Sequence, residues 1–312
     1  MSVTIVPLNN LDLPNGLPLQ FGPKFVLTNF PEWLRKSKDA MGDVDRNERY
    51  RLKDVKHALV AEYFADSYGF PDPDWIGTES RSIQDLRYQS AFLAATALWL
   101  RQPSNVSFTC VFHAVSHLNG RVNDPPIIMR TEREGPYFPH PKDEHNPFQL
   151  KHALHAARLC ALLETVPRKT PVWAALRSLS AALLSYFPDY RYPLLWQSLE
   201  SLFTDEVKER NVTQRLRDRI SYFLAGSEHE QQALSEKVRG CYKMRSKIVH
   251  GRMSAWPEVH VQMEHSEAML RTCIRHILEK PGMLAAFVSP RRDEFFDAWV
   301  ASKAFTPPRL PV

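Results

Sequence analysis

The sequence predicts a mainly α-helical protein in which a mixed α+β domain precedes an all-helical domain. Its 312 residues exceed the usual length of a single-core domain, so two domains are expected. From Gln149 onward, apolar residues recur with a helical period almost throughout, whereas the preceding part combines short alternating stretches with many prolines. We therefore place the mixed domain at residues 1–168, the helical domain at 169–289, and a C-terminal helix and tail at 290–312.

In the mixed domain, alternating apolar residues predict strands and one long apolar segment predicts a helix. Strands are expected at "VTIVPL" and "FVLTNF", and again at "VSFTCVFHAVSHL" with "PPIIMRTE" as its partner. The segment "ESRSIQDLRYQSAFLAATALWLRQ" predicts a helix that enters the core and ends before Pro103. Six prolines between Asn123 and Phe148 indicate a long loop.

The helical domain is expected to be a compact bundle over residues 172–280, because amphipathic segments follow one another with short breaks. The helical segments expected from Gln149 onward are 149–166, 171–187, 192–203, 212–226, 228–251 and 258–280. Pro171 suits a first helical position and Thr213 an N-cap. Gly226 and Gly251 suit C-terminal caps.

Composition narrows the function classes without selecting one. A formal net charge of +5 is compatible with a polyanionic partner but is far from a histone-like excess. Four widely spaced cysteines form no CxxC pair, so neither a zinc ribbon nor a disulfide framework is expected, and a reducing cytoplasm is the expected location. The amino-terminal residues lack a signal-peptide pattern, and no segment is apolar for long enough to cross a bilayer, so no membrane association is expected.

One charged residue interrupts the apolar pattern of "CYKMRSKIVHGRM", residues 241–253. On a helix, Arg245 falls in the middle of an apolar stripe. The apolar members of that stripe are Cys241, Tyr242, Met244, Ile248 and Val249. Because a buried guanidinium is costly unless it is paired, Arg245 is either a member of a structural ion pair or a functional group that faces a cleft.

A histidine follows the arginine at the predicted end of the same helix. His250 directly precedes Gly251, so its imidazole is expected at a helix C-terminus, where the macrodipole favours a cation. Histidine titrates near neutral pH and can serve there as a general acid or base. His250 and Arg245 lie about 140° apart around an ideal helix, so a groove formed with a second copy of the helix is the expected place for them to converge.

In its context, "RSKIVHG" resembles the R-x4-6-H motif of the ApeA-like branch of the HEPN superfamily, an all-helical family. "RYPLLWQSLESLF" is similar to that family's segment with Trp and a Leu-Glu-x-Leu-Phe ending, and "VTQRLRDRISYFLAG" lies between the two. The resemblance covers roughly residues 172–280 and implies a HEPN helical bundle at 169–289. No resemblance to a known family is identified for residues 1–168.

The resemblance implies a metal-independent endoribonuclease that acts as a homodimer and needs no cofactor. Arg245 would bind the scissile phosphate, since a guanidinium forks onto phosphate oxygens. His250 would move the proton, while the RNA itself supplies the 2′-OH nucleophile and is left with a 2′,3′-cyclic phosphate. Such proteins serve as toxins or antiviral defence effectors, and the amino-terminal domain would then sense a trigger or bind a regulatory protein. The alternative is a non-catalytic HEPN module that dimerises and binds a nucleotide or a protein.

Nearby residues have either supporting roles or ordinary structural ones. Ser246 either contributes a hydrogen bond or is an exposed helix serine, and Glu200 either pairs with Arg245 or is solvated. Three cations flank the motif and either meet RNA phosphates or form a solvated face, namely Lys243, Lys247 and Arg252. If Arg245 were structural, its replacement by methionine would strand a partner carboxylate such as Glu200.

A cluster of histidines does not predict a metal site. Their spacing fits no established motif, no cysteine cluster accompanies them, and the segment that holds the first two alternates like a strand. The histidines concerned are His113, His117, His140, His145, His152 and His155.

Overall fold

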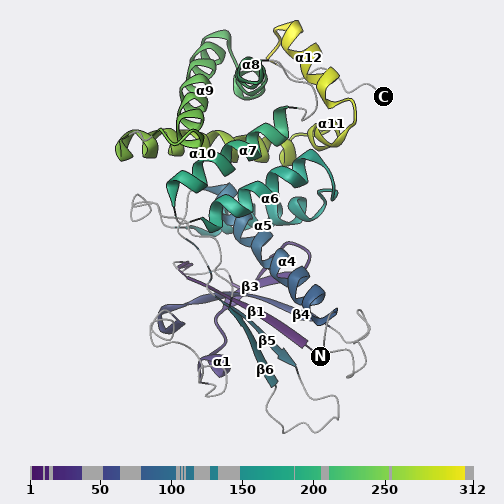
Figure 1. Ribbon diagram of the computed structural model, residues 1–312. Coiled ribbons are helices and arrows are strands. Elements are labelled where there is room, and N and C mark those ends of the chain that lie inside the picture. Colours follow the sequence, from purple (N-terminus) through teal and green to yellow (C-terminus); the bar gives the residue numbers. More distant parts are fainter. Residues whose placement is uncertain are drawn as a thin grey trace. The chain divides into compact units, whose positions relative to one another are not determined.

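The computed structural model describes residues 2–9, 11–13, 17–36, 52–63, 79–102, 106, 108, 110–115, 127–132, 148–185, 187–204, 211–252 and 255–305 (Figure 1). The chain divides into two compact units, residues 1–164 and 165–312. The predicted boundary at residue 168 lies in the connection between the last helix of the first unit and the first helix of the second. Most described residues are helical, as predicted.

The first unit contains a six-stranded antiparallel sheet with the order β2-β3-β4-β1-β5-β6. Its strands are β1 (Ser2–Leu8), β2 (Leu19–Phe21), β3 (Phe25–Asn29), β4 (His57–Tyr63), β5 (Cys110–Val115) and β6 (Ile127–Glu132). The predicted strands correspond to β1, β3, β5 and β6, and β6 pairs with β5 as expected. Sequence reasoning missed β2 and β4. β6 also lies inside the predicted loop between Asn123 and Phe148, and most of the rest of that loop is outside the described residues.

The core of the sheet forms where side chains from both central strands and a short helix meet. β1 lies between β4 and β5, so residues from both of its faces are buried. One cluster joins Ile5 of β1 and Phe112 of β5 to Leu34 of α1 (Glu32–Lys36). Burial on two faces explains why "VTIVPL" has apolar residues at consecutive positions and not only at alternate ones.

Two long helices also belong to the first unit. The predicted long helix is α4 (Glu79–Arg101), and its described side chains from Ala91 to Leu100 are almost all buried. It packs against α5 (Leu150–Glu164), which also contacts β2. Burial of α4 by its neighbours is what its apolar second half requires.

A glycine at the turn after β2 allows a close approach between this turn and α5. Gly22 has a φ of +65°, and a Cβ at this position would lie 2.8 Å from Sγ of Cys160. We expect Gly22→Ala to lower the free energy of unfolding of the first unit by about 1 to 3 kcal/mol, since both the backbone and the contact become strained. Gly240→Ala is the control: it lies within a helix, its Cβ would meet only an atom at 3.8 Å, and it should gain about 0.5 to 1 kcal/mol. Thermal unfolding measures both, and equal effects would contradict the expectation.

The second unit contains helices and no strand among its described residues. Its helices are α6 (Pro171–Leu184), α7 (Pro188–Phe203), α8 (Val212–Leu224), α9 (Glu228–Val249), α10 (Trp256–Glu279), α11 (Met283–Val288) and α12 (Arg292–Ser302). Every helix predicted over residues 172–280 is present. α12 packs against α8 and α11, so the C-terminal helix belongs to the same compact unit.

Some predicted helix ends are wrong. α7 begins at Pro188, not at Tyr192, because proline supplies the helical φ at a first position, and Pro193 is accommodated inside the helix. The N-cap of α8 is Asn211 in the left-handed conformation, not Thr213. Gly226 follows an extended C-cap, so it does not close α8 with a left-handed turn.

α7 lies at the centre of the helical unit, where it contacts α6, α8, α9 and α10 (Figure 1). Its side chains Tyr192, Trp196 and Phe203 are fully buried. Aromatic rings from other helices surround Phe203, among them Phe223 of α8 and Phe287 of α11. Such edge-to-face contacts add to the stabilisation from buried area and fix the position of α7. No described helix combines the length and apolar character that a membrane span requires.

Candidate functional site

The motif "RSKIVHG" forms the last turn of α9 and a glycine-terminated cap. Gly251 has a φ of +68°, and its N–H donates to the carbonyl of Ile248 at 2.9 Å. The N–H of Arg252 donates to the carbonyl of Lys247 at 2.8 Å. These two bonds form a Schellman motif, which confirms Gly251 as the C-terminal cap and fixes the backbone that carries His250.

The apolar stripe on α9 is buried at one end only. Cys241 and Met244 are buried, Ile248 is half-buried, and Val249 is 50% exposed. Arg245 lies between these two parts, with 26% of its side chain exposed. The stripe predicted from the sequence therefore exists, but the part next to His250 is not covered within the described chain.

Arg245 is paired with Glu200, which lies near the end of α7. The Nη2 atom of Arg245 is 3.3 Å from Oε1 and 3.4 Å from Oε2 of Glu200. The guanidinium carbon also lies 5.6 Å from the ring centre of Tyr242, a cation–π distance. The Nε atom of Arg245 is buried and has no hydrogen-bond partner in the described part of the chain. Of the two roles expected for Glu200, pairing with Arg245 is thus the one observed.

Burial controls the charge of Glu200 more than its partners do. Desolvation raises the pKa of this carboxyl, while Arg245 and a hydrogen bond from Tyr242 offset part of the rise. Burial also raises the pKa of the Tyr242 phenol, and the nearby Glu200 carboxylate adds to that rise. The carboxylate is therefore held less favourably here than in water, so the pair can be disrupted by a competing anion or by a proton.

Arg245 and Glu200 line a cavity of about 720 Å³. Its basic lining residues are Lys169, Arg177, Arg245 and Arg292, and its aromatic ones are Trp173 and Tyr242. Thr170, Pro171 and Ala174 bring the first turn of α6 to the same wall. Glu200 is the only carboxylate among the described residues of the lining. A cavity of this size and charge suits an anionic small molecule or a segment of a polyanion.

The structure does not bring His250 into this cavity. The side chain is exposed at the C-cap of α9 and is not among the lining residues. Ser246 and Lys247 are half-buried, whereas Lys243 and Arg252 are exposed. The described chain therefore joins Arg245 with Glu200 but leaves His250 on the surface near the exposed end of the stripe.

Sequence reasoning missed the residues that α6 and α12 contribute to the site. Trp173 and Arg177 are spaced by four residues, which places them on one side of the predicted helix; that spacing is the signal that could have revealed them. Lys169 precedes the Thr170 N-cap with a φ of +62°, so helical spacing does not place it. Arg292 reaches the cavity from far along the chain, and no local pattern indicates it.

Neither a metal site nor a disulfide is observed among the described residues. No group of three or more His, Cys, Asp or Glu side chains there is placed to hold a metal ion. His152 lies buried in α5, where its Nδ1 accepts a hydrogen bond from the Gln149 N–H at 3.3 Å. The other histidines of the cluster named above include His117, His140 and His145, which are outside the described residues. All four cysteines are free and buried.

No protein-family model matches this sequence, and comparisons with curated proteins and with solved structures find no significant match. The likeness to HEPN domains thus rests on the motif residues.

The raised pKa of Glu200 predicts how its removal affects stability. A carboxyl whose pKa is raised in the folded state is favoured there in its protonated form, so its ionisation destabilises the fold as pH rises from its ordinary value near 4.5 through the raised value. We expect Glu200→Gln to be at least as stable as the original protein at pH 7, with any advantage shrinking toward pH about 4. Urea unfolding at both pH values measures this. A variant that is much less stable at pH 7 and recovers in acid would mean that the ion pair outweighs desolvation.

Proposed function

We propose that the helical unit is a HEPN domain of the ApeA-like kind that cuts RNA without a metal ion. The observation that carries the proposal is Arg245, a half-buried cation that lines a positively charged cavity one turn before a capped helix end bearing His250. The cavity offers a guanidinium to a phosphate, and the cap fixes the backbone of the residue that would move the proton.

In the proposed reaction the RNA supplies the nucleophile. The 2′-oxygen attacks the adjacent phosphorus, and the bond from phosphorus to the 5′-oxygen breaks. In the same reaction the 2′-OH loses its proton and the leaving 5′-oxygen gains one. Arg245 stabilises the charge that develops on the phosphate oxygens. His250 takes up or delivers the proton. The products are a 2′,3′-cyclic phosphate and a 5′-OH end.

The proposed enzyme is a homodimer, because His250 and Arg245 do not share a cavity within one chain. Val249 and Trp256, on either side of the α9 end, are 50% and 47% exposed. Covering this surface with a second copy would bury both side chains and bring two sets of Arg245 and His250 to one seam.

Substitution at the exposed stripe tests the dimer. We expect Val249→Glu to convert a dimer into a monomer, because two carboxylates would be buried at the seam. Leu184→Glu is the matched control, since Leu184 is 39% exposed on α6 and lies outside this surface. Light scattering at high micromolar concentration measures the mass. A monomeric original protein, with or without RNA, contradicts the proposal.

In the cell, we propose a cytoplasmic effector of a toxin or antiviral defence system. The first unit, with its six-stranded sheet, would sense the trigger or bind the regulatory protein that controls the nuclease. RNA is then the substrate, and neither a cofactor nor a metal ion takes part.

A second candidate is a non-catalytic HEPN module that binds a nucleotide or protein partner. The observation that favours it is the Arg245–Glu200 pair, since it engages the guanidinium while His250 remains outside the cavity. Under this alternative the pair and the cap are structural, and the cavity serves for binding alone.

Incubation of the pure full-length protein with mixed RNA in EDTA separates the two candidates. The nuclease proposal expects cleavage that persists without divalent metal and disappears in His250→Ala. His229→Ala is the control, because His229 is an exposed histidine in the first turn of α9, outside the motif and at the other end of the helix. Absence of cleavage with every trigger tried, or full cleavage by His250→Ala, would favour the binding module.

A further inference from the structure

The cavity wall formed by Lys169 and the first turns of α6 carries positive charge, and no ion pair with another described residue compensates it. Lys169 and Arg177 are exposed, and neither side chain forms an ion pair or hydrogen bond with another described residue. Trp173 lies between them in the sequence and lines the same wall. Thr170 caps α6 by accepting the Trp173 N–H at 3.3 Å, so the positive end of the helix dipole lies here as well.

The remaining cations of the cavity are already engaged. Arg245 forms an ion pair with Glu200. Arg292 donates hydrogen bonds to the carbonyls of Ser201 at 2.8 Å and Thr204 at 2.5 Å. Arg292 therefore caps the C-terminal end of α7 with hydrogen bonds to its last carbonyls. The carbonyls that it binds would otherwise lack partners at a helix terminus.

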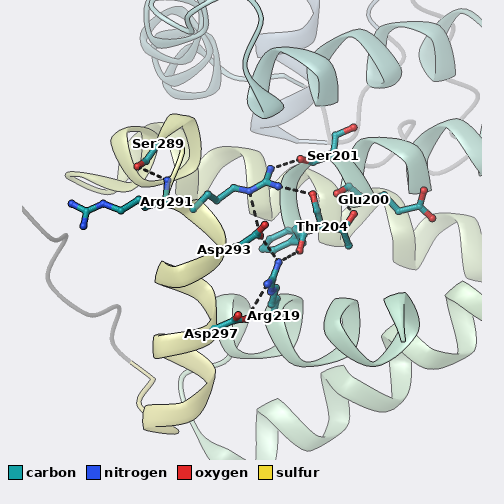
Figure 2. A network of polar contacts seen from close by, with 10 residues as sticks. Glu200, Ser201, Thr204, Arg219, Ser289, Arg291, Asp293 and Asp297 are labelled. Atoms are coloured by element: carbon teal, nitrogen blue, oxygen red, sulfur yellow. Dashed lines mark hydrogen bonds and ion pairs between the residues drawn. The ribbon is translucent and has the colours of Figure 1, made fainter. Parts of the chain in front are cut away.

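A second arginine fixes the same end of α7. Arg219 donates to the Phe203 carbonyl at 2.6 Å and pairs with Asp293 at 2.7 Å and Asp297 at 2.9 Å. Figure 2 shows this network joining the last turn of α7 to α8 and α12. Because two arginines hold the turn that begins at Glu200, the backbone that carries Glu200 at the cavity is fixed before any ligand arrives.

We propose that this cavity binds a phosphate ester through Lys169, Arg177 and Arg245, and that Glu200 is the counter-ion that the phosphate displaces from Arg245. The inference rests on the proposed function in one respect, namely that Arg245 contacts phosphate; it does not require cleavage. A phosphate, singly charged within an RNA strand and doubly charged in AMP, offers at least two oxygens to the guanidinium and competes with a single carboxylate that is poorly solvated, and three cations exceed what Glu200 neutralises. Trp173 also lines the cavity, and the guanidinium carbon of Arg168 lies over its ring at 5.9 Å from the ring centre, which adds a further cation beside this wall.

The same chemistry could come from a free nucleotide or from one nucleotide of an RNA strand. Two probes distinguish these sources: AMP, and a single-stranded oligoribonucleotide made entirely of 2′-O-methyl nucleotides, which cannot be cut by its own 2′-oxygen. Calorimetric titration of each into the full-length protein in EDTA gives the dissociation constants. Binding of AMP identifies a free nucleotide as a sufficient ligand, and binding of the oligonucleotide alone identifies RNA.

Substitutions of the lining residues test whether the probes bind in this cavity. We expect the double variant Lys169→Ala/Arg177→Ala to weaken binding on the order of tenfold or more. Glu200→Gln should tighten binding several-fold, because it removes the competitor. Lys237→Ala is the control for lost charge, since this exposed lysine of α9 does not line the cavity, and it should change binding less than about twofold. Thermal unfolding of each variant checks that the fold is retained.

Failure of this inference differs from failure of the nuclease proposal. A protein that binds AMP or the oligonucleotide through Lys169 and Arg177 but cuts no RNA would contradict the nuclease alone. A protein that cuts RNA but binds neither probe, or binds them equally well without both cations, would overturn the inference. Weaker binding by Glu200→Gln would overturn the displacement of Glu200.

Discussion

Arg245→Lys is expected to lower RNA cleavage by on the order of a hundredfold or more while leaving the free energy of unfolding nearly unchanged. Lysine keeps the charge, so it can still neutralise Glu200 at the cavity wall. It loses the planar fork that contacts two phosphate oxygens at once, and a preorganised donor of this kind typically contributes two to three orders of magnitude in rate. Cleavage assays in EDTA and urea unfolding of the same preparation measure the two quantities.

Arg245→Met extends this test to the structural role of the charge. We expect cleavage to be lost and the free energy of unfolding to fall by about 1 to 2 kcal/mol, because Glu200 loses its cation but can take up a proton. If Arg245 had a structural role alone, the free energy of unfolding would fall by several kcal/mol, because the Glu200 carboxylate would be left buried without its cation. A methionine variant that is destabilised to that extent, or one that still cuts RNA, contradicts the catalytic role.

The largest stability effect is expected at a buried ion pair between α7 and α10. Glu267 is 1% exposed and Arg191 2% exposed; Nη2 and Nε of the arginine lie 2.7 and 3.0 Å from Oε1 of the glutamate. We expect Glu267→Ala to cost about 3 to 5 kcal/mol, because it removes the carboxylate that pairs with a buried guanidinium. Glu279→Ala is the control, since its contact with Arg275 at 3.6 Å is partly exposed and should contribute less than about 1 kcal/mol.

A double variant separates the contribution of the pair from the cost of stranding a charge. Arg191→Met/Glu267→Leu removes both charges and should recover most of the stability lost by Glu267→Ala, since apolar side chains of similar volume often replace a buried pair without loss. Urea unfolding monitored by circular dichroism measures all the variants. A double variant as unstable as the single one would mean that the hydrogen bonds of the pair, and not its charge balance, stabilise the bundle.

The fold was most predictable where local sequence decides structure. The helices after Gln149 follow from apolar period and capping residues, and Gly251 was identified because the left-handed turn needs glycine. β4, "HALVAEY", was missed because a central strand buried on both faces does not alternate clearly, and β2 is only three residues long. The strand order depends on pairings between distant segments, which no local pattern reveals.

The site was predictable only in part for the same reason. The position of Arg245 on an apolar stripe follows from helical period, and its pairing with Glu200 was one of two expectations. Lys169 and Arg177 reach the cavity because α6 packs on α7, and Arg292 because α12 folds back to the end of α7. These contacts depend on tertiary packing. The exposure of His250 was likewise not foreseen for a single chain, although the seam proposed for it requires an accessible surface.

Cleavage of RNA by its own 2′-OH is the central claim, and one comparison tests it most directly. A defined oligoribonucleotide and its 2′-O-methyl counterpart are incubated with the full-length protein in EDTA, and mass spectrometry identifies the product ends. We predict that only the oligoribonucleotide is cut, leaving 2′,3′-cyclic phosphate and 5′-OH ends. Cleavage of the 2′-O-methyl strand, or products that carry a 5′-phosphate, would contradict the mechanism.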